Sequence, residues 1–168
     1  MATLFGENNG AAIGAVVDNA ELGNIRAAQL EFVSDQGAVL GGITASNTGN
    51  ISGNFIVNVD GAITTGSANV IDNGLILDGA SGITLSENIQ SATSFIGLLS
   101  AGASTINQTA GVITTSGLYV VSNTGAVTLT TATNAVDTLA VDVNGNFEFD
   151  GANALDIATV NGVSGVSV

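Results

Sequence analysis

The chain has 168 residues, of which 45% are hydrophobic and 9% charged. It contains 14 acidic residues and only one basic residue, Arg26. This length and apolar fraction suffice for one domain with a buried core, whereas the net charge of −13 excludes nucleic-acid partners, which require many cations. Since Cys and His are absent, disulfides, thiolate nucleophiles and Cys-based metal sites are excluded, and we expect no metal and no cofactor.

Short segments of alternating polarity run along the chain and predict β-strands with one buried face. In Phe147–Asp150, for example, the two Phe residues share one face and the two acids share the other. In chain order the alternating segments are Leu30–Phe32, Phe55–Asp60, Ile83–Leu85, Ala126–Thr130, Leu139–Val143 and Phe147–Asp150. Turn-forming pairs separate them, namely Asp60–Gly61, Asn73–Gly74, Asp78–Gly79, Asn144–Gly145, Asp150–Gly151 and Asn161–Gly162.

One segment near the N-terminus admits a short helix. Apolar residues recur through Asn19–Leu30, but Gly23 interrupts the pattern in its middle. Because Ile25–Phe32 also fits an extended strand, we favour the extended interpretation.

Internal repeats indicate that similar units follow one another along the chain. The four repeats are Val57–Gly61 with Val141–Gly145 (shift 84), Ile83–Leu85 with Val127–Leu129 (shift 44), Gly61–Thr65 with Gly111–Thr115 (shift 50), and Leu75 with Leu118 (shift 43). These shifts predict stacked coils of roughly 21 to 25 residues, because a solenoid tolerates insertions that bulge out as loops.

Two all-β architectures fit these observations, a parallel β-helix (β-solenoid) and a β-sandwich. A sandwich would also show short strands separated by turns. We favour the solenoid because the chain repeats internally, and because it has no Pro and no Lys, with which sandwiches commonly protect their edge strands.

The second half of the chain carries low-complexity units of Gly-Ile-Thr and Asn-x-Val-x-x-Leu type. These lie in Ile106–Leu118, Asn123–Thr130, Asn134–Ala140, Phe147–Asp156 and Val160–Gly165. They resemble the repeat region of large filamentous-haemagglutinin-like exoproteins of bacteria, and autotransporter passenger domains are similar. The resemblance covers about residues 74–168 well and the first 50 residues loosely. It implies a right-handed parallel β-helix that belongs to a secreted adhesin or surface fibre.

We therefore expect residues 1–168 to form a single β-solenoid segment. Residues 1–50 are expected to form an N-terminal cap or less regular coils, and residues 51–168 to form regular coils. The alternation continues through Val166–Val168 with no polar cap. Since solenoids need polar caps at their ends, this predicts either a longer chain or end-to-end stacking with another subunit.

Glu148 and Asp150 are the strongest candidates for catalysis. Two residues apart on one strand, their carboxylates would lie roughly 7 Å apart on the same face, a spacing found in inverting glycosidases. By resemblance to pectate lyases, a lyase reaction would instead need a basic residue that abstracts a proton beside calcium. Only Arg26, far along the chain, is available for this role, and no acidic cluster accompanies it. We favour a solvated strand face over a catalytic pair, and expect that the protein is not an enzyme.

Two further motifs have simpler explanations. Asp142–Asn146 places oxygen-bearing side chains at alternate positions, as calcium loops do, but it lacks the bidentate Glu and is better explained as a turn. Thr128–Thr130 and Thr131–Thr133 resemble the Thr-x-Thr rows of ice-binding β-helices. Such a surface needs the same row on successive coils, and Ile83–Glu87 supplies only one Thr. We expect these Thr residues simply to favour β-structure.

The aromatic residues are expected to fill the core. The Phe residues predicted to stack in ladders inside the coils are Phe5, Phe32, Phe55, Phe95, Phe147 and Phe149. Tyr119 is the one aromatic residue whose hydroxyl group is expected to face a partner.

The leading hypothesis is a non-enzymatic structural or adhesive module, secreted or displayed at a bacterial cell surface. Its partners would be another copy, through its coil ends, or a receptor on a host or neighbouring cell. The alternative is a self-assembling fibre or surface-layer subunit, and a polysaccharide-cleaving enzyme is the least favoured. We expect no membrane insertion, because no apolar run reaches the roughly 18 residues of a spanning helix.

Overall fold

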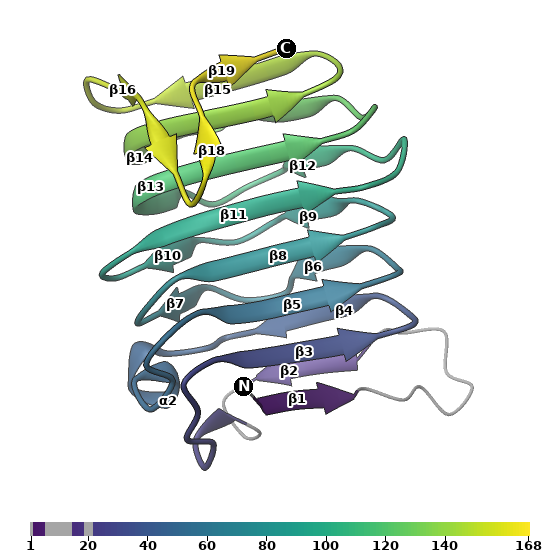
Figure 1. Cartoon of the computed structure of the whole chain (residues 1–168), viewed down its shortest axis with the longest axis vertical. Helices are drawn as coiled ribbons and strands as arrows, with labels where there is room; N and C mark the ends of the chain where they lie inside the picture. The colour runs from purple at the N-terminus through teal and green to yellow at the C-terminus, as the bar shows by residue number, and fades with distance from the viewer. Residues whose placement is uncertain (1, 6–14, 19–21) are drawn as a thin grey trace.

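The structure is a computed structural model, and it describes residues 2–5, 15–18 and 22–168 of the chain. It is nearly all β, and parallel strands wind into a solenoid of about seven turns (Figure 1). Strands in front run to the right and return behind, while the chain climbs from the N- to the C-terminus, so the solenoid is right-handed. The predicted parallel β-helix is therefore confirmed, and the alternative of a β-sandwich is wrong.

Three faces surround the interior, and the first face carries the longest strands. Its strands are β1 (Ala2–Phe5), β3 (Leu30–Ser34), β5 (Phe55–Val59), β8 (Leu75–Gly79), β11 (Phe95–Ser100), the second halves of β13 (Ile113–Ser122) and β14 (Val127–Val143), and, at the C-terminal end, β16 (Asp156–Ile157) and β19 (Val166–Ser167).

The second and third faces complete each coil. The second face contains β2 (Ala15–Asp18), β4 (Ala38–Gly41), β6 (Ile63–Thr65), β9 (Ile83–Leu85), β12 (Ile106–Gln108), the start of β14 and β15 (Phe147–Gly151). The third face contains β7 (Asn69–Ile71), β10 (Ile89–Ser91), the start of β13 and the middle of β14. Strands β13 and β14 are long because each continues from one face to the next.

The strand register explains three of the four sequence repeats. Val57 pairs with Leu77, and the same column continues through Leu98 and Val120 to Val141, so the shift of 84 spans four coils. The shifts of 44 and 43 each span two coils, from Ile83 to Val127 and from Leu75 to Leu118. The prediction of stacked coils is confirmed.

The fourth repeat, with a shift of 50, is not a structural equivalence. Ile63 lies on the second face, where it pairs with Ile83, whereas Ile113 lies on the third face, where it pairs with Ile89. Ile63–Thr65 in β6 and Ile113–Thr115 at the start of β13 have the same burial pattern, with a half-buried Thr between two buried residues, so Gly-x-Ile-Thr-Thr fits either face.

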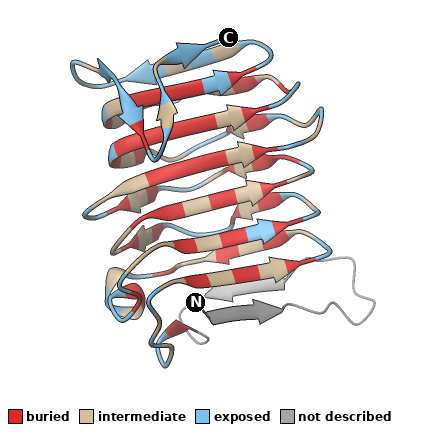
Figure 2. Cartoon of the chain, viewed as in Figure 1, coloured by how far each residue is buried: buried red, intermediate tan, exposed pale blue. Residues whose placement is uncertain are grey.

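Aliphatic side chains fill the interior in columns, and buried residues recur in strand after strand along the solenoid (Figure 2). Val57, Val127 and Val141, which come from coils far apart in the sequence, are fully buried in one continuous cluster. Each coil lies on the one below, so an inward side chain packs against the residue one coil away as well as across the interior. The interior is thus a packed core rather than a channel.

Polar side chains inside the coils are satisfied locally. Asn134, which is fully buried, accepts hydrogen bonds from the Ile113 amide (2.9 Å) and from Gln108 Nε2 (2.8 Å). Its own amide group donates to Gln108 Oε1 (3.1 Å) and to the carbonyl of Leu129 (2.9 Å). This pair of amides joins the second and third faces across neighbouring coils.

Ser100 is the exception among the described residues. Its hydroxyl group is buried and has no hydrogen-bond partner. Because a buried hydroxyl without a partner costs free energy, we expect Ser100→Ala to raise the free energy of unfolding by about 1 kcal/mol. Urea unfolding of both proteins measures this difference. Ser122→Ala is the control, because Ser122 Oγ bonds to Gly125, and that variant should lose stability.

One short helix, α2 (Ala45–Thr48), was not predicted from the sequence. It interrupts the coil after Ile43, and Thr48 Oγ1 accepts a hydrogen bond from the Asp72 amide of the next coil (3.0 Å).

The segment Asn19–Leu30, for which a short helix was the alternative, is described only in part, because residues 19–21 lie outside the described part of the chain. The Ile25 amide donates a hydrogen bond to the Leu22 carbonyl (3.1 Å) and closes a turn there. Ala27 forms an isolated parallel bridge to Ile51, and a bend at Ala28 and Gln29 precedes β3, so the extended interpretation holds only at Ala27 and from Leu30 onward. Within the part that the structure describes, no helix is long and apolar enough to cross a bilayer.

Candidate functional site

The outward side of the first face differs from a typical solvated strand face. The register aligns one outward column in which every residue after the first, Glu31, is uncharged, and most are apolar or small. In order along the solenoid the column contains Glu31, Ile56, Ile76, Gly97, Tyr119 and Ala140. At its C-terminal end this column is buried although it points away from the core, since Tyr119 is 4% exposed and Ala140 is fully buried.

A β-hairpin near the C-terminus covers that end of the column. Strands β17 (Thr159–Val160) and β18 (Val163–Ser164) pair antiparallel. Asn161 and Gly162 connect them with φ angles of 47° and 90°, as in a type I′ turn. The hairpin crosses the strands of the first face on the outside (Figure 1). Thus the turn predicted at Asn161–Gly162 is confirmed.

The hairpin and the first face enclose a small second hydrophobic cluster. Val160 packs with Tyr119 and Ala140, and partly buried residues surround them, namely Ile76, Phe95, Leu99, Val121 and Val163. The Phe95 and Tyr119 rings are tilted by 54° with centroids 5.7 Å apart, an arrangement that favours aromatic pairs.

Tyr119 was expected to present its hydroxyl group to a partner, and this is wrong. Burial raises the pKa of the Tyr119 hydroxyl group. A hydrogen bond with the Asn161 side chain lowers this pKa, and the negative charge of Asp78 raises it. The hydroxyl group is therefore engaged by the hairpin turn of its own chain. The sequence could not show this, because it does not say which part of the chain covers the outside of a strand.

Gly97 is required beneath the Tyr119 ring. A Cβ atom at Gly97 would lie 2.2 Å from Tyr119 Cζ. We expect Gly97→Ala to displace the ring and to cost about 2 kcal/mol of unfolding free energy, as overpacking of a buried site does. Hydrogen exchange of the hairpin amides should accelerate as well. In a Tyr119→Ala background the added methyl group should cost much less; an equal cost there would contradict this explanation.

Asp78 lies in the neighbouring outward column, and burial raises the pKa of its carboxyl group. The folded state therefore holds the proton more tightly than the unfolded state, whose pKa is 3.8. Stability is then lost as the pH rises from that value through the folded pKa. We expect Asp78→Asn to remove this loss and to stabilise the protein at neutral pH by less than about 1 kcal/mol, given solvent screening.

Chemical unfolding of both proteins across the acidic range tests this prediction. Asp142→Asn is the control for removing one negative charge, because Asp142 occupies the same outward column but is exposed. A difference between wild type and Asp78→Asn that stays constant with pH would refute the assignment to Asp78.

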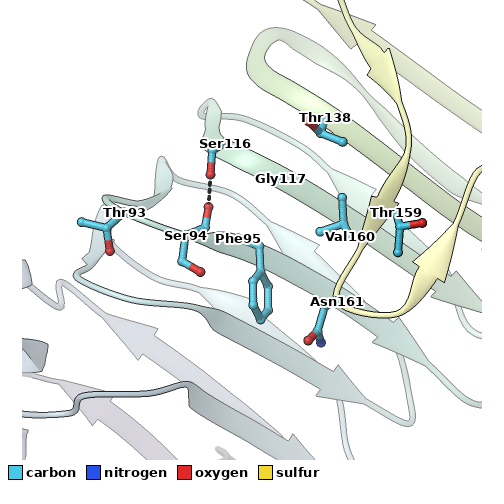
Figure 3. Close-up of a pocket in the computed structure, with 9 residues that line it drawn as sticks. All are labelled: Thr93, Ser94, Phe95, Ser116, Gly117, Thr138, Thr159, Val160 and Asn161. Carbon is cyan, nitrogen blue, oxygen red and sulfur yellow. Dashed lines mark hydrogen bonds between the residues drawn. The ribbon is translucent and has the colours of Figure 1, made fainter.

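A shallow groove of about 440 Å³ lies beside the hairpin. One wall comes from the corners of three successive coils, and the other comes from the hairpin (Figure 3). The residues that line it are Thr93, Ser94, Phe95, Ser116, Gly117, Thr138, Thr159, Val160 and Asn161. No charged side chain lines it, although the chain carries a net charge of −13. This groove could not be predicted from the sequence, since its residues come from four separate segments.

The candidate catalytic residues do not lie in this groove. Glu148 and Asp150 are exposed on β15, where Phe147 and Phe149 alternate with them and turn toward the core. They occupy a solvated strand face, as the sequence predicted. Arg26 lies in an early coil before β3, at the other end of the solenoid from β15, so the structure does not bring it near these acids (Figure 1).

The other two motifs lie on the surface of the coils. Asn144 and Gly145 form the bend between β14 and β15, as expected for a turn, and Asp142 points outward. In the described part of the chain, no three acidic side chains gather closely enough to hold a metal ion. Thr128 aligns with Thr84 two coils below, but Asn107 separates them and Glu148 follows, so the row is not continuous.

The Phe residues do not form one ladder. Phe32 and Phe55 are buried in the core, and Phe147 and Phe149 are partly buried against it, with nearly parallel rings 6.4 Å apart. The side chain of Phe5 lies outside the described part of the chain. The prediction is wrong for Phe95, which points outward into the second cluster.

Comparisons with models of protein families, with curated proteins and with solved structures find no significant match for this chain. Its function is therefore argued from its own residues.

Proposed function

We propose that this β-solenoid is a non-enzymatic structural or adhesive module, secreted or displayed at a bacterial cell surface. The observation that supports it most is the unbroken register of the first face, in which the inward column runs from Leu30 through every coil to Leu139. Such a stack is a stiff scaffold that presents the same outward positions once per coil. The resemblance of residues 74–168 to filamentous exoproteins points the same way.

Beads coated with the purified full chain test the proposal. We expect them to adhere to bacterial or epithelial cells more strongly than beads coated with albumin, and we expect the chain to leave polysaccharides undegraded. Depolymerisation that disappears in the Glu148→Gln, Asp150→Asn variant would instead establish an enzyme.

A self-assembling fibre or surface-layer subunit is the second candidate. The most exposed large apolar side chains of the described residues, Ile157 (52%), Val166 (47%) and Val168 (73%), all lie at the C-terminal end of the solenoid. An apolar strand edge is a ready surface for pairing with another chain.

Electron microscopy and size-exclusion chromatography distinguish the two candidates. Discrete monomers favour the module, whereas regular filaments favour the subunit. Filaments should form more readily at high salt, because screening weakens the repulsion between copies that each carry a charge of −13. Ile157→Ser and Val166→Ser should prevent them.

A further inference from the structure

We infer that the groove between the β17–β18 hairpin and the first face is a binding site for a neutral oligosaccharide. The inference deepens the adhesive part of the proposed function and rests on it. It starts from the composition of the groove, which combines one aromatic ring with five hydroxyl-bearing residues and an amide.

Two of the hydroxyl groups are available to a ligand. The side chains of Ser94 and Thr138 make no hydrogen bond to any residue that the structure describes. They lie two coils apart on the same wall, because Ser94 adjoins Phe95, and Phe95, Gly117 and Thr138 align on three successive coils (Figure 3). Coils are spaced by about 4.8 Å, so this wall is roughly 10 Å long and can accommodate a short oligosaccharide.

Other contacts fix the shape of the groove. Ser116 Oγ donates to the Ser94 carbonyl, and Thr159 and Ser164 hydroxyls bond to each other at 2.8 Å. Gly117 lies between Phe95 and Val160, and a Cβ atom there would lie 3.0 Å from Val160 Cγ1. The missing side chain at this position therefore lets the hairpin pack closely on the strand and form the second wall.

The chemistry of the lining selects a neutral polyol. Hydroxyl and amide groups both donate and accept hydrogen bonds, which matches the hydroxyl groups of a sugar, while the partly buried Phe95 ring offers apolar surface to its C–H face. Acidic residues flank the groove without lining it: Asp137 is adjacent to Thr138, and Asp156 pairs with Thr138 across the strands. Their charge, added to the net charge of the chain, repels anionic sugars.

Titration calorimetry and amide NMR with cellotetraose, maltotetraose and mannotetraose test the inference, and an oligogalacturonate serves as the anionic comparison. We expect at least one neutral tetrasaccharide to bind, with shifts confined to residues 93–95, 116–117, 138 and 159–161. The oligogalacturonate should not bind.

Matched variants locate the site. Ser94→Ala combined with Thr138→Val should weaken binding about tenfold, through loss of the two hydroxyl groups. Thr128→Val makes the same change on the second face of the same strand, β14, and should leave binding unchanged. Circular dichroism checks that all variants fold.

The inference is overturned if none of the three neutral sugars binds, if the anionic sugar binds better, or if the double variant binds as wild type does. In each of those cases adhesion of the coated beads to cells would leave the proposed function standing. If the wild-type chain binds a neutral sugar but beads coated with it adhere to cells no better than albumin-coated beads, only the proposed function is refuted.

Discussion

Leu98→Ala is expected to lower the free energy of unfolding by about 3 kcal/mol. Leu98 is fully buried in the middle of the solenoid, where it pairs with Leu77 on one side and with Val120 on the other. Removing its side chain forfeits the burial of the missing atoms and leaves a cavity. The coils above and below are hydrogen-bonded in register and limit how far the structure can relax into this cavity, so a cost well above that of an exposed Leu→Ala substitution is expected.

Urea unfolding followed by circular dichroism measures this loss. Leu99→Ala is the matched control, because it removes the same atoms from the outward, half-buried position next in the strand, and about 1 kcal/mol is expected there. Since each coil contacts only its neighbours, the central defect should also separate the unfolding of the two ends into distinct steps. Equal losses for Leu98→Ala and Leu99→Ala would contradict the assignment of inner and outer columns.

Alternation of polarity was sufficient to identify the strands, and the internal repeats then favoured the solenoid over the sandwich. Phe55–Val59 and Leu139–Val143 place their alternating apolar residues inward, as the sequence predicted, because one face of each strand is buried against the same interior. The length of a repeat was not what made it reliable, since the five-residue repeat with a shift of 50 joins two different faces. The shift of 84 from Val57 to Val141 counts coils because both segments include the end of a strand on the first face and the turn after it.

Alternation fails where both sides of a strand are apolar. In Gly117–Ser122 the outward residues are Tyr119 and Val121, so the pattern does not say which set faces the core. The assignment of Phe95 to the core was wrong for this reason. Only the position of the hairpin, folded back by the turn at Asn161–Gly162, explains why these apolar residues tolerate an outward orientation.

Helix α2 could not be predicted for a different reason. Ala45–Thr48 is shorter than any helix that is stable alone, and it has no apolar period. Its conformation depends on contacts with the next coil, such as the hydrogen bond from the Asp72 amide to Thr48. The groove beside the hairpin depends in the same way on four segments that the fold brings together, which no single stretch of sequence reveals.

Asn134→Leu is expected to cost about 4 kcal/mol, although leucine fits the size of the site and is apolar like the surrounding core. The substitution leaves the Ile113 amide and Gln108 Oε1 buried without the partners that they have in the wild type. Each such orphaned group costs about 1–3 kcal/mol. Asn107→Leu on the outward side of β12 changes the same residue type in a half-buried position and should have little effect.

A double-mutant cycle separates the buried pair from general packing. Gln108→Leu alone should also destabilise strongly, because it leaves Asn134 with fewer partners in the interior. Combined with Asn134→Leu it should cost clearly less than the sum of the two, since neither amide then lacks the other. The Ile113 amide remains without an acceptor in the double variant, so stability should not return to the wild-type value. Additive losses would mean that the two amides act independently, and that packing alone joins the second and third faces at this corner.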